Sequence, residues 1–212
     1  MRRRRRVVIA HGWNDVPSNG WINWLATELQ ARGIEVVAPE FPHRHVPRLG
    51  RWIETLIEAA GKLDRNTVLV GYSLGSPTTL RLLNDYPGKV RIAGLVLVAG
   101  FGDGIRERPG ALFRPALDFE LIWKRARRRV CIYSDNDWLI APERSKDLAQ
   151  RIGAEEVVVL GAGHFVALKQ LPRVTDRLPA ALEAVLSCYP RSFGERLAGT
   201  WERLCRYYNR YT

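Results

Sequence analysis

The stretch that decides the fold is Thr67-Val68-Leu69-Val70-Gly71-Tyr72-Ser73-Leu74-Gly75. Its apolar first half is typical of a buried strand, and its second half is a G-x-S-x-G pentapeptide followed by a helix-like segment. In such a strand-to-helix turn the serine hydroxyl lies above the carboxyl edge of a sheet, and Gly71 and Gly75 are needed because side chains there would collide with their neighbours. The pentapeptide alone is a weak indicator, since glycine and serine are common in turns. Its meaning depends on whether a base, an acid and an oxyanion hole accompany it.

Short apolar runs alternate with helix-period segments along most of the chain. The runs are rich in β-branched residues and are predicted to be strands buried on both faces, at residues 7–10, 36–38, 67–70, 95–98, 130–133 and 157–160. Helices are predicted at about residues 21–31, 49–60, 77–86, 142–152 and 174–186. The alternation predicts an α/β fold, with a mostly parallel six-stranded sheet covered by helices on both faces.

The length of 212 residues predicts one domain, residues 1–187, followed by a tail. Residues 101–118 interrupt the alternation with loop residues and are expected to form a short cap. In the tail, residues 188–212, aromatic and leucine residues recur every three or four positions while arginines mostly occupy other faces, which predicts a basic amphipathic helix. Three arrangements are open to such a helix: packing on its own domain, pairing in a homodimer, or contact with a membrane surface.

Composition excludes several classes of protein. No run approaches the roughly 18 apolar residues of a membrane span, and the apolar run after the basic start is too short for a signal peptide. The three cysteines, Cys131, Cys188 and Cys205, are too few for a disulfide framework, so a cytoplasmic location is expected. No Cys/His spacing typical of zinc is present, and we expect neither a metal nor a cofactor.

Residues able to do chemistry follow the predicted strands. His11 follows the first strand, Ser73 the third, Ser134-Asp135-Asn136-Asp137 the fifth and Gly163-His164 the sixth. Because the carboxyl ends of parallel strands meet at one edge of a sheet, we expect these side chains to lie close together. Their order along the chain, serine then acid then histidine, is the order expected of a hydrolase with this fold class.

Each of three residues fits one role in nucleophilic catalysis. The hydroxyl of Ser73 is a poor nucleophile until a base removes its proton, and His164 can accept that proton near neutral pH. The carboxylate of Asp137 would hold the imidazole in the correct tautomer. Asp135 is an alternative acid, but Asp137 is preferred because the acid usually lies a few residues before an apolar residue that returns to the core, here Ile140.

Further residues support or compete with these roles. Backbone N–H groups of Trp13 and Leu74 are the expected oxyanion hole. His11, before Gly12, is an alternative base but is interpreted as a brace of the oxyanion loop, and Asp103, after the fourth strand, is an alternative acid. Aromatic side chains on the same loop edge are candidates for an apolar acyl pocket, although they would equally well seal the rim of the core: Phe41, Phe101, Phe113 and Trp138.

Over about residues 7–187 the chain resembles the small α/β-hydrolase-fold serine hydrolases of the retinoblastoma-binding-protein-9 and YdeN type. The resemblance is carried by His11-Gly12-Trp13, the pentapeptide, Phe113-Arg114-Pro115, Ser134-Asp135-Asn136-Asp137 and Gly163-His164-Phe165. It implies a sheet in the order 2-1-3-4-5-6 and a triad formed by the serine, aspartate and histidine of these motifs. Many relatives have a proline after the acid, where this chain has Trp138.

The net charge of +11 is distributed unevenly along the sequence. Arginines and lysines precede the predicted strands, for example Arg2–Arg6 and Arg127–Arg129, and are expected to gather on the edge opposite the catalytic residues. Such a face, or the tail helix, is suited to an anionic membrane or nucleic acid, although a solvated basic surface is the simpler interpretation and no nucleic-acid module is present.

The sequence therefore predicts a serine hydrolase, either esterase-like or an amidase or peptidase, acting on a small ester, thioester or amide. The alternative is a non-catalytic protein-binding module on a hydrolase scaffold. A complete triad favours chemistry, and the chain contains no Leu-x-Cys-x-Glu peptide.

Overall fold

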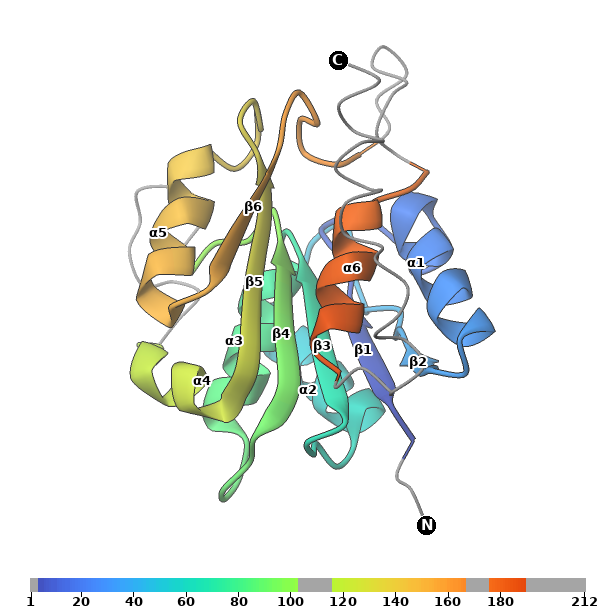
Figure 1. Cartoon of the computed structure of the whole chain (residues 1–212), viewed down its shortest axis with the longest axis vertical. Coiled ribbons are helices and arrows are strands. Elements are labelled where there is room, and N and C mark those ends of the chain that lie inside the picture. Colours follow the sequence, from blue (N-terminus) through green and yellow to red (C-terminus); the bar gives the residue numbers. More distant parts are fainter. Residues whose placement is uncertain (1–3, 103–115, 167–175, 190–212) are drawn as a thin grey trace, which may run out of the picture.

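The sheet at the centre of the computed structural model has the strand order β2-β1-β3-β4-β5-β6, and every strand is parallel to its neighbours (Figure 1). The structure describes residues 4–102, 116–166 and 176–189. The predicted fold class and strand order are confirmed. The strands are β1 (Arg6–Ala10), β2 (Glu35–Val37), β3 (Thr67–Tyr72), β4 (Ile92–Val98), β5 (Ala126–Ser134) and β6 (Glu155–Val159).

Helices cover both faces of this sheet. Helices α1 and α6 pack on one face, and α2, α3, α4 and α5 pack on the other (Figure 1). None of the helices in the described ranges is long and apolar enough to cross a membrane. The helices are α1 (Gly20–Ala31), α2 (Leu49–Ala60), α3 (Gly75–Asp85), α4 (Phe119–Arg125), α5 (Pro142–Ile152) and α6 (Pro179–Ser187).

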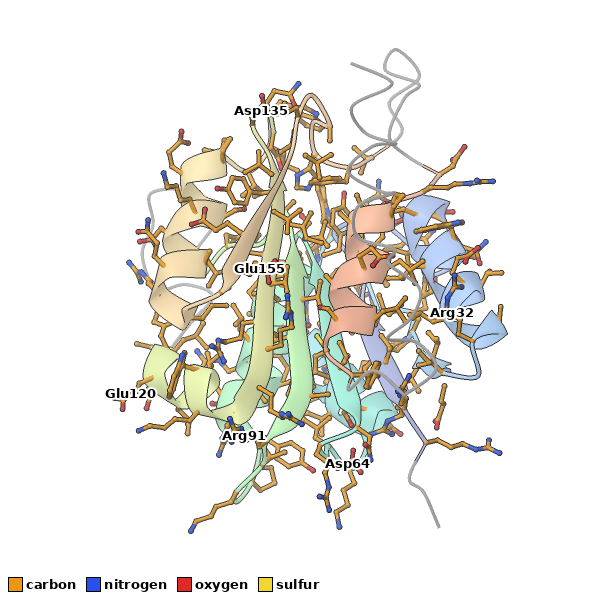
Figure 2. The ribbon with its side chains drawn as sticks, viewed as in Figure 1. Arg32, Asp64, Arg91, Glu120, Asp135 and Glu155 are labelled. Carbon is orange, nitrogen blue, oxygen red and sulfur yellow. The ribbon has the colours of Figure 1, made fainter. Side chains whose placement is uncertain are left out.

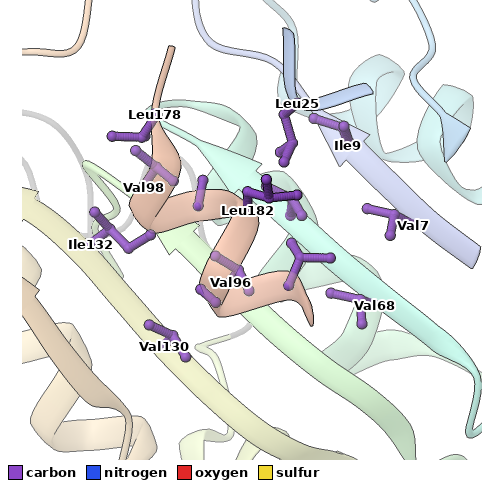
Figure 3. Close-up of a cluster of buried hydrophobic side chains, with 14 of the residues drawn as sticks. Val7, Ile9, Leu25, Val68, Val96, Val98, Val130, Ile132, Leu178 and Leu182 are labelled. Carbon is purple, nitrogen blue, oxygen red and sulfur yellow. The ribbon is translucent and has the colours of Figure 1, made fainter. Parts of the chain in front are cut away.

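The alternation of side chains along each central strand divides the core into two layers. In β1, Val7 and Ile9 face α1 and α6, whereas Val8 and Ala10 face the opposite layer. Figure 3 shows the first layer, in which Leu25 of α1 and Leu182 of α6 meet the valines and isoleucines of the strands. Burial of each such side chain contributes about 1.5–3 kcal/mol, so the central strands form a rigid base for the loops at their carboxyl ends.

The expectation that every strand is buried on both faces is wrong for the two edge strands. Glu35 of β2 is exposed, and Val158 of β6 is 47% exposed. Leu160, expected in the last strand, follows β6 and is 70% exposed. Each edge strand has only one neighbouring strand, and a β-branched run does not reveal whether its strand lies at the centre or the edge of a sheet.

Helix α4 is an element that the helix pattern did not predict. The Asp118 carboxylate caps it by accepting a hydrogen bond from the backbone N–H of Leu121 at 2.8 Å. Lys124 and Arg125 occupy its last turn, where the helix dipole interacts favourably with cations. The helix leads directly into β5, which begins at Ala126 and is therefore longer than expected.

The carboxyl end of the described domain packs against its amino end. Cys188 and Tyr189 are buried in the same layer as α6, and the Tyr189 hydroxyl donates to the carbonyl oxygen of Arg6 at 2.8 Å. The packed domain thus continues at least through Tyr189, two residues beyond the expected boundary. Most of the predicted cap and the predicted tail helix lie outside the described residues.

Candidate active site

Ser73 lies at a sharp turn between β3 and α3. Its φ of +49° is in the left-handed region, which non-glycine residues adopt only when the surroundings impose it. The surroundings do so here, because the Ser73 N–H donates to the carbonyl oxygen of Val98 and the Ser73 carbonyl oxygen accepts from the N–H of Ser76, both at 2.9 Å. The turn is therefore held from β4 and from the first turn of α3.

The glycines around this serine are required by close backbone contacts. A Cβ on Gly71 would lie 2.7 Å from the Cα of Ser76, and one on Gly75 would lie 2.6 Å from the carbonyl carbon of Ala10. Separations below 3.0 Å do not occur for real Cβ atoms. The absence of side chains at these two positions is thus what allows α3 to begin against β1 with Ser73 at the sheet edge.

His164 and Asp137 complete a line of hydrogen bonds that starts at Ser73. The Nε2 atom of His164 is 2.9 Å from the Ser73 Oγ, and its Nδ1 atom is 2.8 Å from Oδ2 of Asp137. All three residues are buried. Because a carboxylate only accepts hydrogen bonds, Nδ1 carries the proton in the neutral ring, and Nε2 is left to accept the proton of the serine hydroxyl.

The two aspartates after β5 have different partners. Asp137 faces His164, and its Oδ1 atom also accepts from the backbone N–H groups of Leu139 and Ile140 at 2.9 Å. Asp135 is exposed and accepts instead from the N–H of Gly161 at 2.8 Å. The geometry therefore favours Asp137 as the partner of the imidazole, and the buried side chain of Ile140 is the apolar anchor that follows it.

His11 is fully buried, and both of its ring nitrogens bond to backbone groups. Its Nδ1 donates to the carbonyl oxygen of Gly12 at 2.8 Å, and its Nε2 accepts from the N–H of Phe41 at 3.1 Å. Burial lowers the pKa of this imidazole, which keeps it neutral and suited to these two bonds. The structure thus places His11 as a brace between two loops rather than beside Ser73 as a base.

The loop after β1 is tied to residues 41–45 by two further contacts. The N–H of Asn14 donates to the carbonyl oxygen of Arg44, and the Trp13 indole N–H donates to the carbonyl oxygen of His45, both at 3.1 Å. The backbone N–H groups of Trp13 and Leu74 make no hydrogen bond to any described residue. Trp13 lines the same cavity as Ser73, and Leu74 is the next residue after Ser73 in the chain.

A cavity of about 550 Å³ opens beside Ser73 and His164. Its charged lining residues in the described ranges are Asp15 and Asp176. No group of three or more His, Cys, Asp or Glu side chains within those ranges could hold a metal ion. A separate hollow of about 590 Å³ along residues 40–45 does not include Ser73. The walls of the cavity beside Ser73 are about equally polar and apolar, and their apolar part includes Trp13, Trp21, Ile22, Trp138, Leu139 and Phe165.

Of the three aromatic pocket candidates that lie in the described ranges, Trp138 alone lines this cavity. Trp138 is 55% exposed at its rim, with its ring 6.0 Å from that of His164. Phe41 is instead buried and stacked on Trp52 at 4.5 Å, and Phe101 is fully buried in the layer beneath α3, α4 and α5. The backbone of both residues lies at the loop edge, but their side chains turn into the core. Phe113, like Asp103, lies outside the described residues.

Tyr72 is a site residue that the sequence analysis missed. Its buried hydroxyl donates to the carbonyl oxygen of His164 at 2.7 Å and so links the pentapeptide to the histidine loop. Its position next to Ser73 was visible in the sequence, but nothing in a linear pattern reveals a partner 92 residues away.

Comparison with known proteins gives a consistent result. A family model described as "Serine hydrolase" matches residues 7–178. YdeN of Bacillus subtilis (strain 168), a protein classed as a hydrolase, is 33% identical over 179 residues, which are 82% of this chain and 94% of YdeN. The crystal structure of the B. subtilis ydeN gene product has a TM-score of 0.79 and 31% identity over 87% of this chain and 98% of that one.

More distant structures show the fold alone. A hydrolase of the alpha/beta superfamily from Xanthomonas campestris pv. campestris has a TM-score of 0.59 at 23% identity, over 87% of this chain and 97% of that one. Esterase PE8 has a TM-score of 0.59 at 16% identity, over 88% of this chain and 93% of that one. Both support the fold class.

Proposed function

The chain belongs to the serine hydrolase family whose model spans residues 7–178, and on this premise we propose that it hydrolyses a small ester, thioester or amide through an acyl-enzyme on Ser73. The observation that carries the proposal is the line of hydrogen bonds from Asp137 through His164 to Ser73. A protein that only binds a partner has no need of this buried arrangement, because removing polar groups from water costs free energy that their hydrogen bonds must offset.

In the first half of the proposed reaction, the Ser73 Oγ attacks the carbonyl carbon of the substrate. As the C–O bond forms, the hydroxyl proton passes to Nε2 of His164, and the carbonyl oxygen becomes an oxyanion. The backbone N–H groups of Trp13 and Leu74 are the proposed donors to that oxyanion, and each such donor is typically worth about 3 kcal/mol in the transition state. The proton then passes from His164 to the leaving group, the bond to that group breaks, and an acyl-serine remains.

The second half repeats the same steps with water. Nε2 of His164 takes a proton from a water molecule, whose oxygen attacks the acyl carbon and forms a second oxyanion. Collapse of this intermediate returns the proton to the Ser73 Oγ and releases the carboxylic acid. Asp137 stabilises the imidazolium in both halves, and it keeps its own negative charge throughout.

The apolar side chains at the rim of the cavity support an apolar group on the substrate. Trp13, Trp138 and Leu139 are between 40% and 55% exposed at the rim, and their free area is suited to an alkyl or aryl group. We therefore propose an esterase-like preference for small apolar acyl esters. Amide hydrolysis, as in an amidase or peptidase, is the second reaction that the same groups could perform.

A fluorophosphonate probe tests the proposal, because it reacts only with an activated serine. We expect wild-type protein to be labelled and Ser73→Ala to be unlabelled, with esterase activity reduced by about four to six orders of magnitude. Ser187→Ala is the matched control, since Ser187 lies on α6 and bonds to Ala184, and it should label like wild type. Circular dichroism verifies that all three are folded. A folded wild-type protein that neither labels nor hydrolyses p-nitrophenyl esters would overturn the proposed function.

A further inference from the structure

Consecutive side chains at the end of β5 bind consecutive backbone N–H groups of the loop after β6. The Asp135 Oδ1 accepts from Gly161 at 2.8 Å, the Ser134 Oγ from Ala162 at 2.9 Å, and the Asn136 Oδ1 from Gly163 at 2.8 Å. The three acceptor residues are called the amide clamp below. The residue after Gly163 is His164.

The clamp is tied together internally. The Ser134 hydroxyl donates to the Asn136 Oδ1 at 2.8 Å while it accepts from Ala162. Ser134 is fully buried, so its hydroxyl depends on these partners rather than on water. The Asn136 oxygen therefore receives two hydrogen bonds, which orients its side chain toward Gly163.

These bonds lie beyond the end of the sheet. The pairing of β5 with β6 ends where Ser134 is opposite Val159, whereas the clamp binds residues 161–163. Gly161 and Gly163 have φ values of +68° and +56°, a region in which glycine is mobile unless it is held. The sheet alone thus does not fix this loop, and the clamp acts on the segment that carries the imidazole.

His164 is also held from its other side, because its carbonyl oxygen accepts from the Tyr72 hydroxyl at 2.7 Å. The clamp holds the chain before the imidazole, and Tyr72 holds it after. A displacement of about 1 Å in a reacting group can reduce a rate about 100-fold. The distance between Nε2 of His164 and the Ser73 Oγ therefore depends on the position of the loop backbone as much as on the orientation of the ring.

We propose that Ser134, Asp135 and Asn136 are positioning residues that set the place of His164 through the N–H groups of residues 161–163. This inference rests on the proposed function for its catalytic consequence, and its geometric part stands independently. Asp135 and Asp137, two residues apart, then have separate tasks: the first holds the loop and the second holds the imidazole.

The first test removes the acceptor nearest to His164. We expect Asn136→Ala to lower kcat for a p-nitrophenyl ester by about 10- to 100-fold with little change in KM. Asn23→Ala, on the exposed face of α1, is the matched control and should retain wild-type kcat. A second pair tests the need for an oxygen: Asp135→Asn keeps an acceptor and should lose much less activity than Asp135→Ala.

Non-additivity separates positioning from general destabilisation. In an Asp137→Asn background the imidazole is in the wrong tautomer to accept the serine proton, so its exact position matters less. Asn136→Ala should then lower kcat by a much smaller factor than it does in wild type. Because His164 serves both half-reactions, the rates of acylation and deacylation in burst experiments should fall together. An effect of equal size in both backgrounds, or a loss of melting temperature without a loss of kcat, would overturn the proposal.

Amide hydrogen exchange tests the clamp without any activity. In Asn136→Ala the N–H of Gly163 should exchange about tenfold faster than in wild type, while amides of the β3 core keep their protection. Unchanged exchange at residues 161–163 refutes the clamp whatever the activity shows. A wild-type protein that does not react with the fluorophosphonate probe refutes the proposed function instead, so the two failures are distinguishable.

Discussion

The carboxyl and amino ends of the same sheet use their polar side chains in opposite ways. At the carboxyl end, polar groups from separate loops converge, and the buried side chains of Ser73, Asp137 and His164 bond to one another. At the amino end, cations are spread out, and Arg6, Arg125 and Arg128 each bond to a different nearby group. Figure 2 shows the contrast, with Asp135 at one end of the molecule and Arg91 near the other.

The partners at the amino end are mostly backbone carbonyls and surface carboxylates. Arg6 donates to the carbonyl oxygen of Lys62, and Arg128 pairs with Glu155. Exposed ion pairs contribute about 0–1 kcal/mol each to the free energy of unfolding, so those at this end stabilise the fold only slightly. We therefore expect polar groups at the carboxyl end to control activity with small effects on stability. Cations at the amino end should leave activity unchanged, and should affect stability where they bind backbone carbonyls rather than where they form exposed ion pairs.

Replacement of Asp137 should produce the largest effect and belongs to the carboxyl end. Asp137→Asn is expected to lower kcat by about 10⁴-fold, because the amide donates to His164 and favours the wrong tautomer. The midpoint of urea denaturation should change much less than this loss of activity suggests. Steady-state kinetics on purified protein checks it, and a larger loss for Asp135→Asn than for Asp137→Asn would show that the acid is misassigned.

Arg125, at the amino end, should show the opposite behaviour. Its guanidinium donates to the carbonyl oxygens of Leu83, Asn84 and Gly88, at and just beyond the carboxyl end of α3. Arg125→Ala should reduce the free energy of unfolding by about 2 kcal/mol because the part-buried carbonyls of Leu83 and Asn84, as well as the exposed one of Gly88, lose a charged donor. The kcat measured well below the melting temperature should stay at the wild-type value. Arg127→Ala, an exposed neighbour, should change neither quantity, and a fall in kcat for Arg125→Ala would break the comparison.

Replacement of Tyr72 tests whether a single residue affects both stability and activity. Tyr72→Phe removes the hydroxyl that binds the carbonyl oxygen of His164. We expect a loss of about 1 kcal/mol in the free energy of unfolding and about a tenfold fall in kcat, because a buried acceptor loses its donor and the histidine loop loses one support. Denaturation curves and kinetics on the same preparation measure both. A change in stability alone would mean that Tyr72 supports the fold without placing the imidazole.

The smallest expected effect is a pH dependence due to His11. Burial lowers the pKa of this imidazole in the folded state, so the unfolded chain binds the proton more readily. The stabilisation is therefore complete above the unfolded pKa of about 6.5 and is lost progressively as the pH falls below it. Urea denaturation at pH 7.5 and pH 5.5 should show a smaller decrease for His11→Gln than for wild type. Equal decreases would show that other groups account for the acid sensitivity.

Sequence reasoning placed residues correctly where their position depends on a local motif or on the ends of strands. The turn at Ser73 and the proximity of Asp137 and His164 follow from the rule that the carboxyl ends of parallel strands share an edge. It failed where the direction of a single side chain decides the outcome, as for Phe41 and Phe101, whose rings point into the core. It also missed pairs such as Asn136 with Gly163, because hydrogen-bond partners distant in sequence leave no periodic signal. Predictions of a homodimer, of an anionic partner for the basic edge or the tail helix, and of a cytoplasmic location stay predictions.

The contact between Tyr189 and the first strand places the two ends of the described domain next to each other. The Arg5 guanidinium lies 5.1 Å from the centre of the Tyr189 ring, next to the hydrogen bond from that residue to Arg6. During synthesis, β1 leaves the ribosome long before Tyr189, so the surroundings of this strand are complete only after the chain has reached that residue. For protein engineering, the same adjacency makes residues 4 and 189 a natural junction for a circularly permuted chain, with new ends opened in a surface loop elsewhere.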